Sequence, residues 1–300
     1  MAATPPRLLS EPRVVGDVRA TLGEGLCWSP TAQALWWVDI LEQRLYRDGE
    51  AGAHDAWSFD ETISAVAERA GGAGLAVTLR RGLALFDPAT RALVRLDEPE
   101  RERAGNRFND GKCDARGRFW GGTMDFAVRV PTGALYRFDA SGRAQRAIDL
   151  GWIVTNGPTW TQDGRTMLVN DTVQRRVVAY AFDPETGAVG ASREWLALPP
   201  ADGHPDGMTT DAAGRIWIAH WGGACVTCHD AVSAAELARI ALPTDHITNV
   251  AFGGPDMTTL FVSSATFELT DAQRAAQPLA GALFAVETDA RGLPANLFAG

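Results

Sequence analysis

The sequence is short of basic charge, of cysteine and of long apolar runs, and each shortage excludes a class of protein. Its 28 basic residues against 37 acidic ones give a net charge of −9, which argues against nucleic acid or an anionic membrane surface as a partner. No stretch approaches the ~18 apolar residues of a membrane span. The first residues lack the charged start and apolar core of a secretory signal, so we expect a cytoplasmic protein.

Four cysteines in 300 residues do not make a disulfide framework. Cys225, Cys228 and His229 have the spacing of a c-type haem attachment site. Haem attachment of that kind requires export, and the segment falls where a strand is expected, so we predict no haem. A redox pair or a zinc pair at the two cysteines stays open beside the ordinary alternative of two strand cysteines.

Two further absences concern chemistry. The sequence has no Gly-x-Ser-x-Gly nucleophile elbow and no nucleotide-binding fingerprint, which leaves serine-nucleophile chemistry and nucleotide cofactors without support. Lys112 is the only lysine, and every other basic residue is arginine. Codon usage is the ordinary explanation of that excess. The sharper interpretation is that Lys112 occupies a place where arginine would not do, with support of its loop favoured over contact with a ligand.

What the sequence does contain is a repeat of roughly 45 residues. Six β-rich apolar runs recur along the chain, and they are centred on Trp37, Val77, Trp120, Leu168, Trp217 and Phe261. A second alternating run follows each of them, and turns rich in Gly, Pro and Asp separate the runs. Six such units predict an all-β fold, a six-bladed β-propeller with four-stranded blades around a central channel. The periodic markers of WD40 repeats are absent.

The organisation outside the repeat is simple. No linker or low-complexity stretch divides the chain, so we expect residues 1–14 to form an N-terminal tail and residues 15–300 a single propeller domain. Helix is scarce, and the best candidate is a short one at 270–276 with Thr270 as its N-cap. His204 is expected to be a loop residue beside a proline.

Three polar residues stand at the same place in three of the units. Glu24, Asn156 and Asp206 are each followed by glycine, and each lies 11 residues before a position in the apolar run of its unit. Equivalent positions of successive propeller blades lie on a ring around the axis, so these side chains are expected in register at one mouth of the channel. Asn109 and Asn249 share the same offset.

All members of this ring carry oxygen ligands, which suit a hard or borderline divalent cation. We therefore predict one cation site for Ca²⁺, Mg²⁺ or Mn²⁺, with Zn²⁺ or Fe²⁺ as further options, and Glu24, Asn156 and Asp206 as its ligands. For any single residue the ordinary alternative is a turn, since Asp-Gly and Asn-Gly are common turn dipeptides. The offset shared by three units favours a site.

Several segments spread over most of the chain carry a family likeness. They are LGEGLCW at 22–28, NRFNDGKCD at 106–114, GRFWGGTM at 117–124, TNGPTW at 155–160, PDGM at 205–208 and WGG at 221–223. With them the chain resembles the senescence marker protein, gluconolactonase and regucalcin family of six-bladed propellers. The resemblance implies a metal-dependent lactonase that hydrolyses a gluconolactone, xylonolactone or arabinonolactone type of sugar lactone to the aldonic acid.

The resemblance also implies roles for individual residues. The three ring residues match the family's metal ligands, and Arg107 and Asn109 match residues that contact the sugar. Some members carry an acidic substrate contact shortly after the Gly-Thr-Met motif, and here only Asp125 could take that role. As a mechanism, the cation would polarise the lactone carbonyl, and Asp206 would act as general base on the attacking water.

Two other functions are compatible with a site made only of oxygen ligands. One is a promiscuous metal-dependent phosphoesterase, and the other is a non-catalytic calcium-binding or regulatory propeller. Binding and catalysis need the same ligands, so the sequence does not separate them. The expected partner is a small sugar lactone, with no nucleic acid and no membrane, and the expected state is a monomer.

Overall fold

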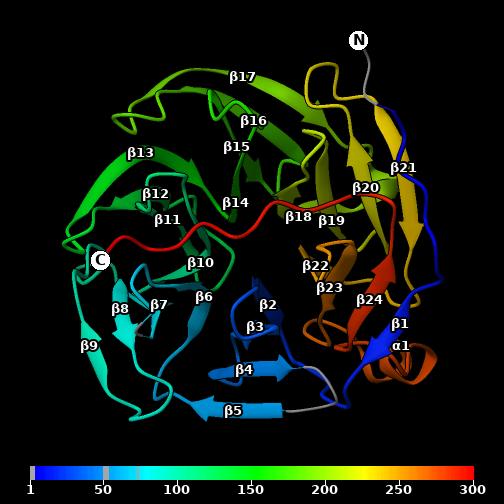
Figure 1. The fold of residues 1–300 in the computed structure, drawn as a ribbon, viewed down its shortest axis with the longest axis horizontal. Coiled ribbons are helices and arrows are strands. Elements are labelled where there is room, and N and C mark those ends of the chain that lie inside the picture. The colour runs from blue at the N-terminus through cyan, green and yellow to red at the C-terminus, as the bar shows by residue number, and fades with distance from the viewer. Residues whose placement is uncertain (1–3, 50–53, 73) are drawn as a thin grey trace.

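The computed structural model describes residues 4–49, 54–72 and 74–300, and these are almost entirely β-strands and turns. The strands form six four-stranded antiparallel sheets, which stand as blades in a ring around a central channel (Figure 1). The six-bladed propeller expected from the repeat is confirmed. In blades 1 to 5 the four strands follow one another in chain order from the channel outward.

The bounds of the elements, taken from the channel outward, are as follows. The innermost strands of blades 1 to 6 are β2 (Gly23–Ser29), β6 (Ile63–Glu68), β10 (Asn106–Cys113), β14 (Thr155–Trp160), β18 (His204–Thr210) and β22 (Ile247–Gly253). The second strands are β3 (Ala34–Asp39), β7 (Leu75–Leu79), β11 (Phe119–Asp125), β15 (Thr166–Asp171), β19 (Ile216–Trp221) and β23 (Thr259–Ser264). The third strands are β4 (Arg44–Gly49), β8 (Leu83–Phe86), β12 (Gly133–Phe138), β16 (Arg176–Phe182), β20 (Cys225–His229) and β24 (Leu283–Glu287). The outermost strands are β5 (His54–Ser58), β9 (Leu93–Arg95), β13 (Ala144–Trp152), β17 (Val189–Ala197), β21 (Glu236–Ala241) and β1 (Arg13–Val15).

The ring is closed in blade 6, where the two ends of the chain meet. The N-terminal strand β1 is the outermost strand of that blade and pairs with β24. Further upstream, Leu8 forms a bridge with Thr288. The boundary expected after residue 14 therefore falls inside β1, and residues 8–15 are part of blade 6 rather than a tail. The physical reason is that the outer edge of β24 would otherwise leave its backbone groups unpaired.

One pattern of turn residues builds the inner hairpins of two blades. In blade 3 the Asp114 carboxylate accepts a bond from the Trp120 indole at 2.8 Å and pairs with Arg118 at 2.6 Å. Segment 211–217 of blade 5 repeats both contacts with the same D-x-x-G-R-x-W sequence as 114–120. The glycine of each turn has a positive φ, which costs glycine little. The pattern fixes where the second strand of each blade begins.

The segment after β24 crosses one face of the ring, from blade 6 to blades 2 and 3 (Figure 1). We call residues 288–300 the C-terminal strap. Within it, the amide of Phe298 donates to the Glu68 carbonyl at 2.8 Å, and that of Ala299 to the Gly117 carbonyl at 2.9 Å. The Phe298 side chain is fully buried among apolar residues of blades 2 and 3. The strap therefore covers one end of the channel.

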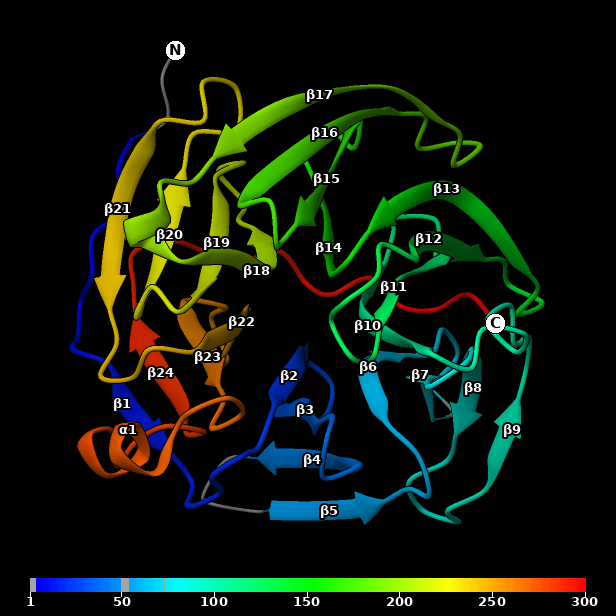
Figure 2. The same cartoon turned by 180° about the vertical axis from the view of Figure 1, so that it is seen from behind.

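The single α-helix of the described residues, α1 (Asp271–Ala276), lies between β23 and β24 at the edge of blade 6 (Figure 2). Thr270 is its N-cap and forms a capping box with Gln273, in which each side chain bonds the other residue's backbone amide. The helix expected at 270–276 is confirmed. Within the described ranges, no helix has the length and apolar character needed to cross a membrane.

Candidate active site

Two cavities lie at opposite ends of the central channel. The first, of about 210 Å³, is lined by residues at the start of the innermost strands, and we call it the mouth cavity. The second, of about 230 Å³, is lined by the ends of those strands and by the C-terminal strap, and we call it the strap cavity. Figure 1 views the ring from the strap side and Figure 2 from the mouth side. The mouth cavity contains five of the six predicted site residues, namely Glu24, Arg107, Asn109, Asn156 and Asp206.

A β-bulge occurs in each strand that carries a predicted ligand. The regular pairing of β2 with β3 is interrupted after Glu24, that of β14 with β15 after Asn156, and that of β18 with β19 after Pro205. Gly25 and Gly157, which follow the first two, have φ values of 61° and 82°. A bulge frees a residue from the ladder and re-aims its side chain. The acid-glycine and amide-glycine dipeptides are therefore bulges that open onto the mouth cavity.

The shared sequence offset does not place the three ligands at identical positions. Glu24 and Asn156 belong to the last regular pair before the bulge, opposite Val38 and Asn170. Asp206 is instead the first residue inside the bulge, one place later in its strand. The turn between β18 and β19 is one residue longer than the turn between β2 and β3. Asp206 therefore still lies 11 residues before a position in its apolar run, although its place in the strand differs. The expectation that the three ligands occupy equivalent strand positions is therefore wrong by one residue for Asp206.

Three buried carboxylates lie near one another beneath the mouth. Glu24, Asp110 and Asp206 are each at most 6% exposed. Burial, and then the charge of Asp110, raises the pKa of Glu24 to about 8. Burial, and then the charge of Glu24, raises the pKa of Asp206 well above its usual range. Burial also raises the pKa of Asp110. In the described part of the chain, no ion pair joins any of the three to Lys, Arg or His.

Neighbouring amides and a hydroxyl hold the proposed ligands in place. Asn249 donates through Nδ2 to Glu24 Oε2 at 2.7 Å. Asn109 donates through Nδ2 to Asn156 Oδ1 at 2.7 Å, and Asn156 donates through its own Nδ2 to Thr172 Oγ1 at 2.9 Å. The bonds from Asn249 and Asn109 link side chains of different blades, whereas the bond to Thr172 lies within blade 4. The site is therefore fixed by the closed ring rather than by any one hairpin.

Arg107 is the buried cation of the mouth cavity. Its Nη1 donates to the Phe108 carbonyl at 3.0 Å and to Asn109 Oδ1 at 2.6 Å. The guanidinium carbon also lies 5.7 Å from the centroid of the Phe126 ring. Burial lowers the pKa of Arg107 to about 10, so the side chain remains charged at neutral pH.

Asp125 is not among the residues that line the mouth cavity. Its Oδ2 accepts bonds from the backbone amides of Arg129 at 2.7 Å and Val130 at 3.2 Å. The carboxylate therefore holds the loop that follows β11. Met124 and Val128, on either side of it in the sequence, line the cavity instead.

Some residues of the site were not singled out from the sequence. The Asp110 carboxylate accepts bonds from the amides of Gly111 at 2.7 Å and Gly157 at 2.9 Å, which joins blade 3 to blade 4. Asp110-Gly111 is itself an acid-glycine dipeptide, so it carries the same sequence pattern as the predicted ligands. Phe267 and Glu268 line the cavity from the loop before α1. They lie outside the repeat and carry no comparable signal.

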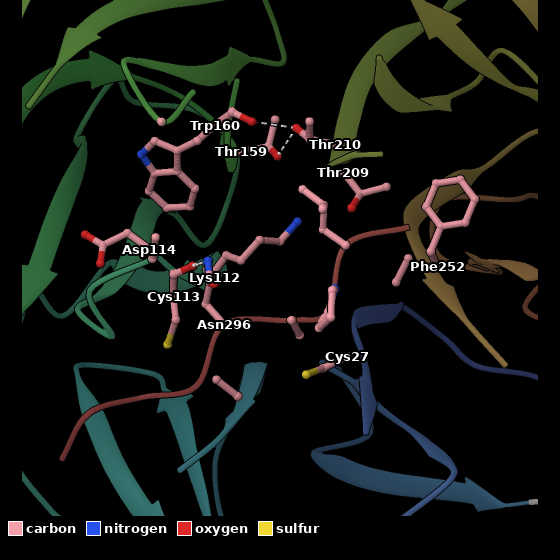
Figure 3. Close-up of a pocket in the computed structure, with 18 of the residues that line it drawn as sticks. Cys27, Lys112, Cys113, Asp114, Thr159, Trp160, Thr209, Thr210, Phe252 and Asn296 are labelled. Carbon is pink, nitrogen blue, oxygen red and sulfur yellow. Dashed lines mark hydrogen bonds between the residues drawn. The ribbon is translucent and has the colours of Figure 1, made fainter. Parts of the chain in front are cut away.

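Lys112 faces the strap cavity and not the mouth (Figure 3). Its Nζ donates to the Met208 carbonyl at 2.6 Å, which ties β10 to β18 across the channel. Burial lowers its pKa, and the charge of Asp110 acts in the opposite sense. The structure thus gives Lys112 the supporting role. A compact ammonium suits this position, because the larger planar guanidinium of arginine has a different shape and fixed donor directions.

The two clustered cysteines do not form a site. Cys225 and Cys228 are free and buried on β20. Cys225 contacts the Arg239 guanidinium at 3.4 Å, whereas Cys228 packs in the core cluster of blades 5 and 6. Residues three apart on a strand point to opposite faces. The pair therefore cannot share a zinc ion or close a disulfide within this strand.

The described residues contain no group of three or more His, Cys, Asp or Glu side chains around one metal position. A cation at the mouth would need amide oxygens in addition to the carboxylates of Glu24 and Asp206. Asn156 is the amide side chain best placed for this, because Asn109 and Thr172 fix its orientation.

Comparison with known proteins agrees with the fold. The pentonolactonase XacC of Haloferax volcanii is 38% identical over 289 residues, which cover 94% of this chain and 96% of that protein. The L-arabinolactonase of Azospirillum brasilense is 33% identical over 290 residues, which cover 96% of this chain and 95% of that protein. The crystal structure of a calcium-binding protein, regucalcin, from Agrobacterium tumefaciens aligns with a TM-score of 0.90 and 29% identity, covering 99% of both chains.

The family relationship follows from the extent of the match. Residues 22–266 match the family model described as the SMP-30/Gluconolactonase/LRE-like region. That range runs from the first innermost strand to the end of β23 and includes all five predicted residues of the mouth cavity. The chain belongs to the SMP-30/gluconolactonase/LRE-like family of six-bladed propellers.

Proposed function

We propose that this protein is a sugar lactonase, which hydrolyses an aldonolactone to the aldonic acid with one divalent cation bound at the mouth cavity. Full-length relatives named as a pentonolactonase, an L-arabinolactonase and a 6-deoxy-6-sulfogluconolactonase support the reaction class. The observation that carries the cation is a pair of buried carboxylates, Glu24 and Asp206, without an ion-pair partner in the described residues.

A divalent cation fits this donor set. Buried charges in proteins are normally paired with an opposite charge or bound to a metal. Glu24 and Asp206 each oppose the ionisation of their neighbours, and a doubly charged ion would relieve that repulsion. Asn156 Oδ1 adds a neutral oxygen. Carboxylate and amide oxygens suit Ca²⁺, Mg²⁺ and Mn²⁺, and carboxylates also bind Zn²⁺ and Fe²⁺.

When bound, such a cation supplies Lewis acidity to the lactone carbonyl. In the proposal Asp206 is the general base. Its carboxylate makes one bond with the Gly207 amide and no side-chain bond in the described residues. One oxygen is therefore free to take a proton from the attacking water. The new C–O bond forms from that water, the ring C–O bond breaks, and the ring oxygen leaves as a hydroxyl that recovers the proton.

Arg107 and Asn109 orient the sugar in this proposal, each in a defined way. Among the described residues, hydrogen bonds engage Arg107 through Nη1 alone, so its remaining N–H groups are donors for lactone hydroxyls. Asn109 uses its amide group as donor to Thr155 O and Asn156 Oδ1. Its Oδ1 accepts a bond from Arg107 Nη1, and the second lone pair of that oxygen is left to accept a bond from a substrate hydroxyl.

The test is a lactone panel run with defined cations. Metal-stripped protein is reloaded separately with Ca²⁺, Mg²⁺, Mn²⁺, Zn²⁺ and Fe²⁺, and hydrolysis of neutral aldonolactones and of p-nitrophenyl phosphate is measured. We expect lactone hydrolysis with at least one cation. We expect a loss of about 10²–10⁴-fold in Asp206→Ala, with an unchanged circular dichroism spectrum.

The same panel separates the alternatives. Calcium binding without hydrolysis of any lactone under any cation would favour the non-catalytic calcium-binding propeller. Hydrolysis of the phosphate ester in place of lactones would favour the phosphoesterase. Full lactone hydrolysis by metal-loaded Asp206→Ala would remove Asp206 from the role of base.

A further inference from the structure

The two sides of the mouth-cavity rim differ in chemistry. The side formed by blade 3 presents Met124 and Val128, and we call it the apolar rim. The side formed by the loop before α1 presents Phe267 and Glu268, and we call it the acidic rim. The rim of a pocket sets substrate choice when the reacting groups lie at its floor. The contrast therefore bears on which lactone fits.

The apolar rim is built so that no carboxylate reaches the cavity from blade 3. Asp125 is the only acid next to Met124 and Val128 in the sequence, and its Oδ2 accepts bonds from the amides of Arg129 and Val130. The turn that results places Val128 at φ 56°. A β-branched residue in the left-handed region is unusual and costs backbone energy. The two bonds to Asp125 hold this turn in place. The turn presents the apolar side chain of Val128 to the cavity.

The acidic rim holds Glu268 on a fixed backbone. The amide of Phe267 donates to the Thr21 carbonyl at 2.9 Å, and the carbonyl of Phe267 contacts His246 Nδ1 at 2.9 Å. On the other side, Leu269 is buried. Glu268 itself has a φ of 65°, which is again a strained conformation for a residue with a side chain.

The carboxylate of Glu268 is exposed, and no hydrogen bond or ion pair engages it in residues 4–49, 54–72 and 74–300. A carboxylate that accepts no hydrogen bond within these ranges, and that an anchored backbone holds at the rim of a cavity, is well placed to contact a ligand.

An aromatic surface stands next to this carboxylate. Trp221 lines the mouth cavity and stacks on His246 with a centroid distance of 4.0 Å and an interplanar angle of 11°. The Phe267 ring lies 6.4 Å from the Trp221 ring. A flat apolar surface accommodates the C–H face of a sugar ring, and an adjacent carboxylate accepts bonds from its hydroxyls. The acidic rim therefore has the two parts that recognition of a sugar needs.

We propose that Glu268 is a specificity-determining residue of this site, which accepts hydrogen bonds from hydroxyls of a neutral lactone while Met124 and Val128 contact an edge without hydroxyls. The inference rests on the proposed lactonase function. It identifies the substrate class as neutral lactones with one apolar ring edge, such as pentonolactones and 6-deoxyhexonolactones. Lactones that carry a carboxylate, sulfonate or phosphate are disfavoured, because the free charge of Glu268 repels them.

The experiment compares Glu268→Gln with wild type on three substrates: a neutral pentonolactone, a neutral hexonolactone and a lactone that carries a carboxylate. We expect wild type to prefer them in that order. In Glu268→Gln we expect KM for the pentonolactone to rise about tenfold, as when a charged acceptor is replaced by a neutral one, while kcat changes little. The discrimination against the anionic lactone should fall about tenfold, and Glu268→Lys should reverse it.

Glu102→Gln, at an exposed glutamate outside the cavity, is the matched control and should behave as wild type. If Glu268→Gln keeps the KM values and the neutral-to-anionic ratio of that control, this inference is overturned while the lactonase function stands. If wild type hydrolyses no lactone at all, the lactonase function fails, and this inference fails with it. A wild type that prefers the anionic lactone also overturns the assignment of Glu268.

Discussion

Asn109 Nδ2 donates to Asn156 Oδ1 at 2.7 Å, and this bond joins blades 3 and 4 at the mouth of the channel. The other end of the Asn156 amide donates to Thr172 Oγ1 at 2.9 Å. The two bonds together decide which atom of Asn156 is the oxygen. Asn109 is therefore a positioning residue for a proposed cation ligand, in addition to any contact with the sugar.

Replacing Asn109 by alanine should weaken binding of the activating cation about 10–100-fold, the usual cost of removing a group that orients a ligand. In that variant only the bond to Thr172 would still orient the Asn156 amide. Calorimetric titration of metal-stripped protein measures the affinity. Asn296→Ala is the control, because that amide donates to the Cys113 carbonyl at 3.1 Å beside the strap cavity. Equal affinities in the two variants would contradict the positioning role.

Glu24→Gln should make the metal-free protein more stable while removing its response to cations. The substitution keeps the shape of the side chain and removes one of three mutually repelling buried carboxylates. Thermal unfolding with and without saturating cation measures both effects. Glu100→Gln should make the metal-free protein less stable, because that buried carboxylate accepts bonds from Asn106 and Tyr136. A Glu24→Gln protein that is less stable without metal and still stabilised by cation would refute the repulsion argument.

The fold could be predicted because the residues that form each hairpin lie close together in the sequence. Turns such as 114–120 and 211–217 carry their own hydrogen-bond acceptors and glycines, so each hairpin follows from its own residues. The closing strand could not be predicted in the same way. β1 has its partner in β24, at the far end of the chain, and nothing local to residues 1–15 indicates that pairing.

The floor of the site was predictable, and its rim was not. Glu24, Asn156 and Asp206 recur with the repeat, although the longer hairpin of blade 5 shifts one of them by one residue. The acidic rim depends on contacts such as that between Phe267 and the Thr21 carbonyl. These two residues come from opposite ends of the chain, and closure of the ring brings them into contact. No spacing pattern in the sequence indicates that contact.

Phe298→Ala should destabilise the protein by about 3–5 kcal/mol, the range seen when a buried phenylalanine is truncated. The side chain is fully buried under the strap. Its loss should leave lactone kcat/KM unchanged well below the melting temperature, because the strap covers the opposite end of the channel. Urea unfolding measures the stability. Leu297→Ala, at a side chain that is 43% exposed, should cost far less, and equal costs would mean that the strap is not anchored by Phe298.

A pair of buried histidines makes blade 5 sensitive to acid. Nε2 of His220 and Nε2 of His229 approach the Thr227 hydroxyl from two sides at 2.6 and 2.8 Å. Burial lowers the pKa of both histidines. The folded protein therefore binds fewer protons here than the unfolded chain, whose histidines titrate near a pKa of about 6.5. The stability that these groups contribute is complete above that pH and is lost as the pH falls below it.

The free energy of unfolding, measured with saturating cation, should therefore fall as the pH is lowered from about 7.5 to about 5.5. His229→Gln should show a smaller fall than wild type, because one of the two groups that must be kept neutral is gone. His54→Gln, at an exposed histidine of blade 1, should keep the full wild-type fall. If His229→Gln loses as much stability over this range as wild type does, the acid sensitivity does not come from the blade 5 pair, and His246, whose pKa burial also lowers, is the next histidine to replace.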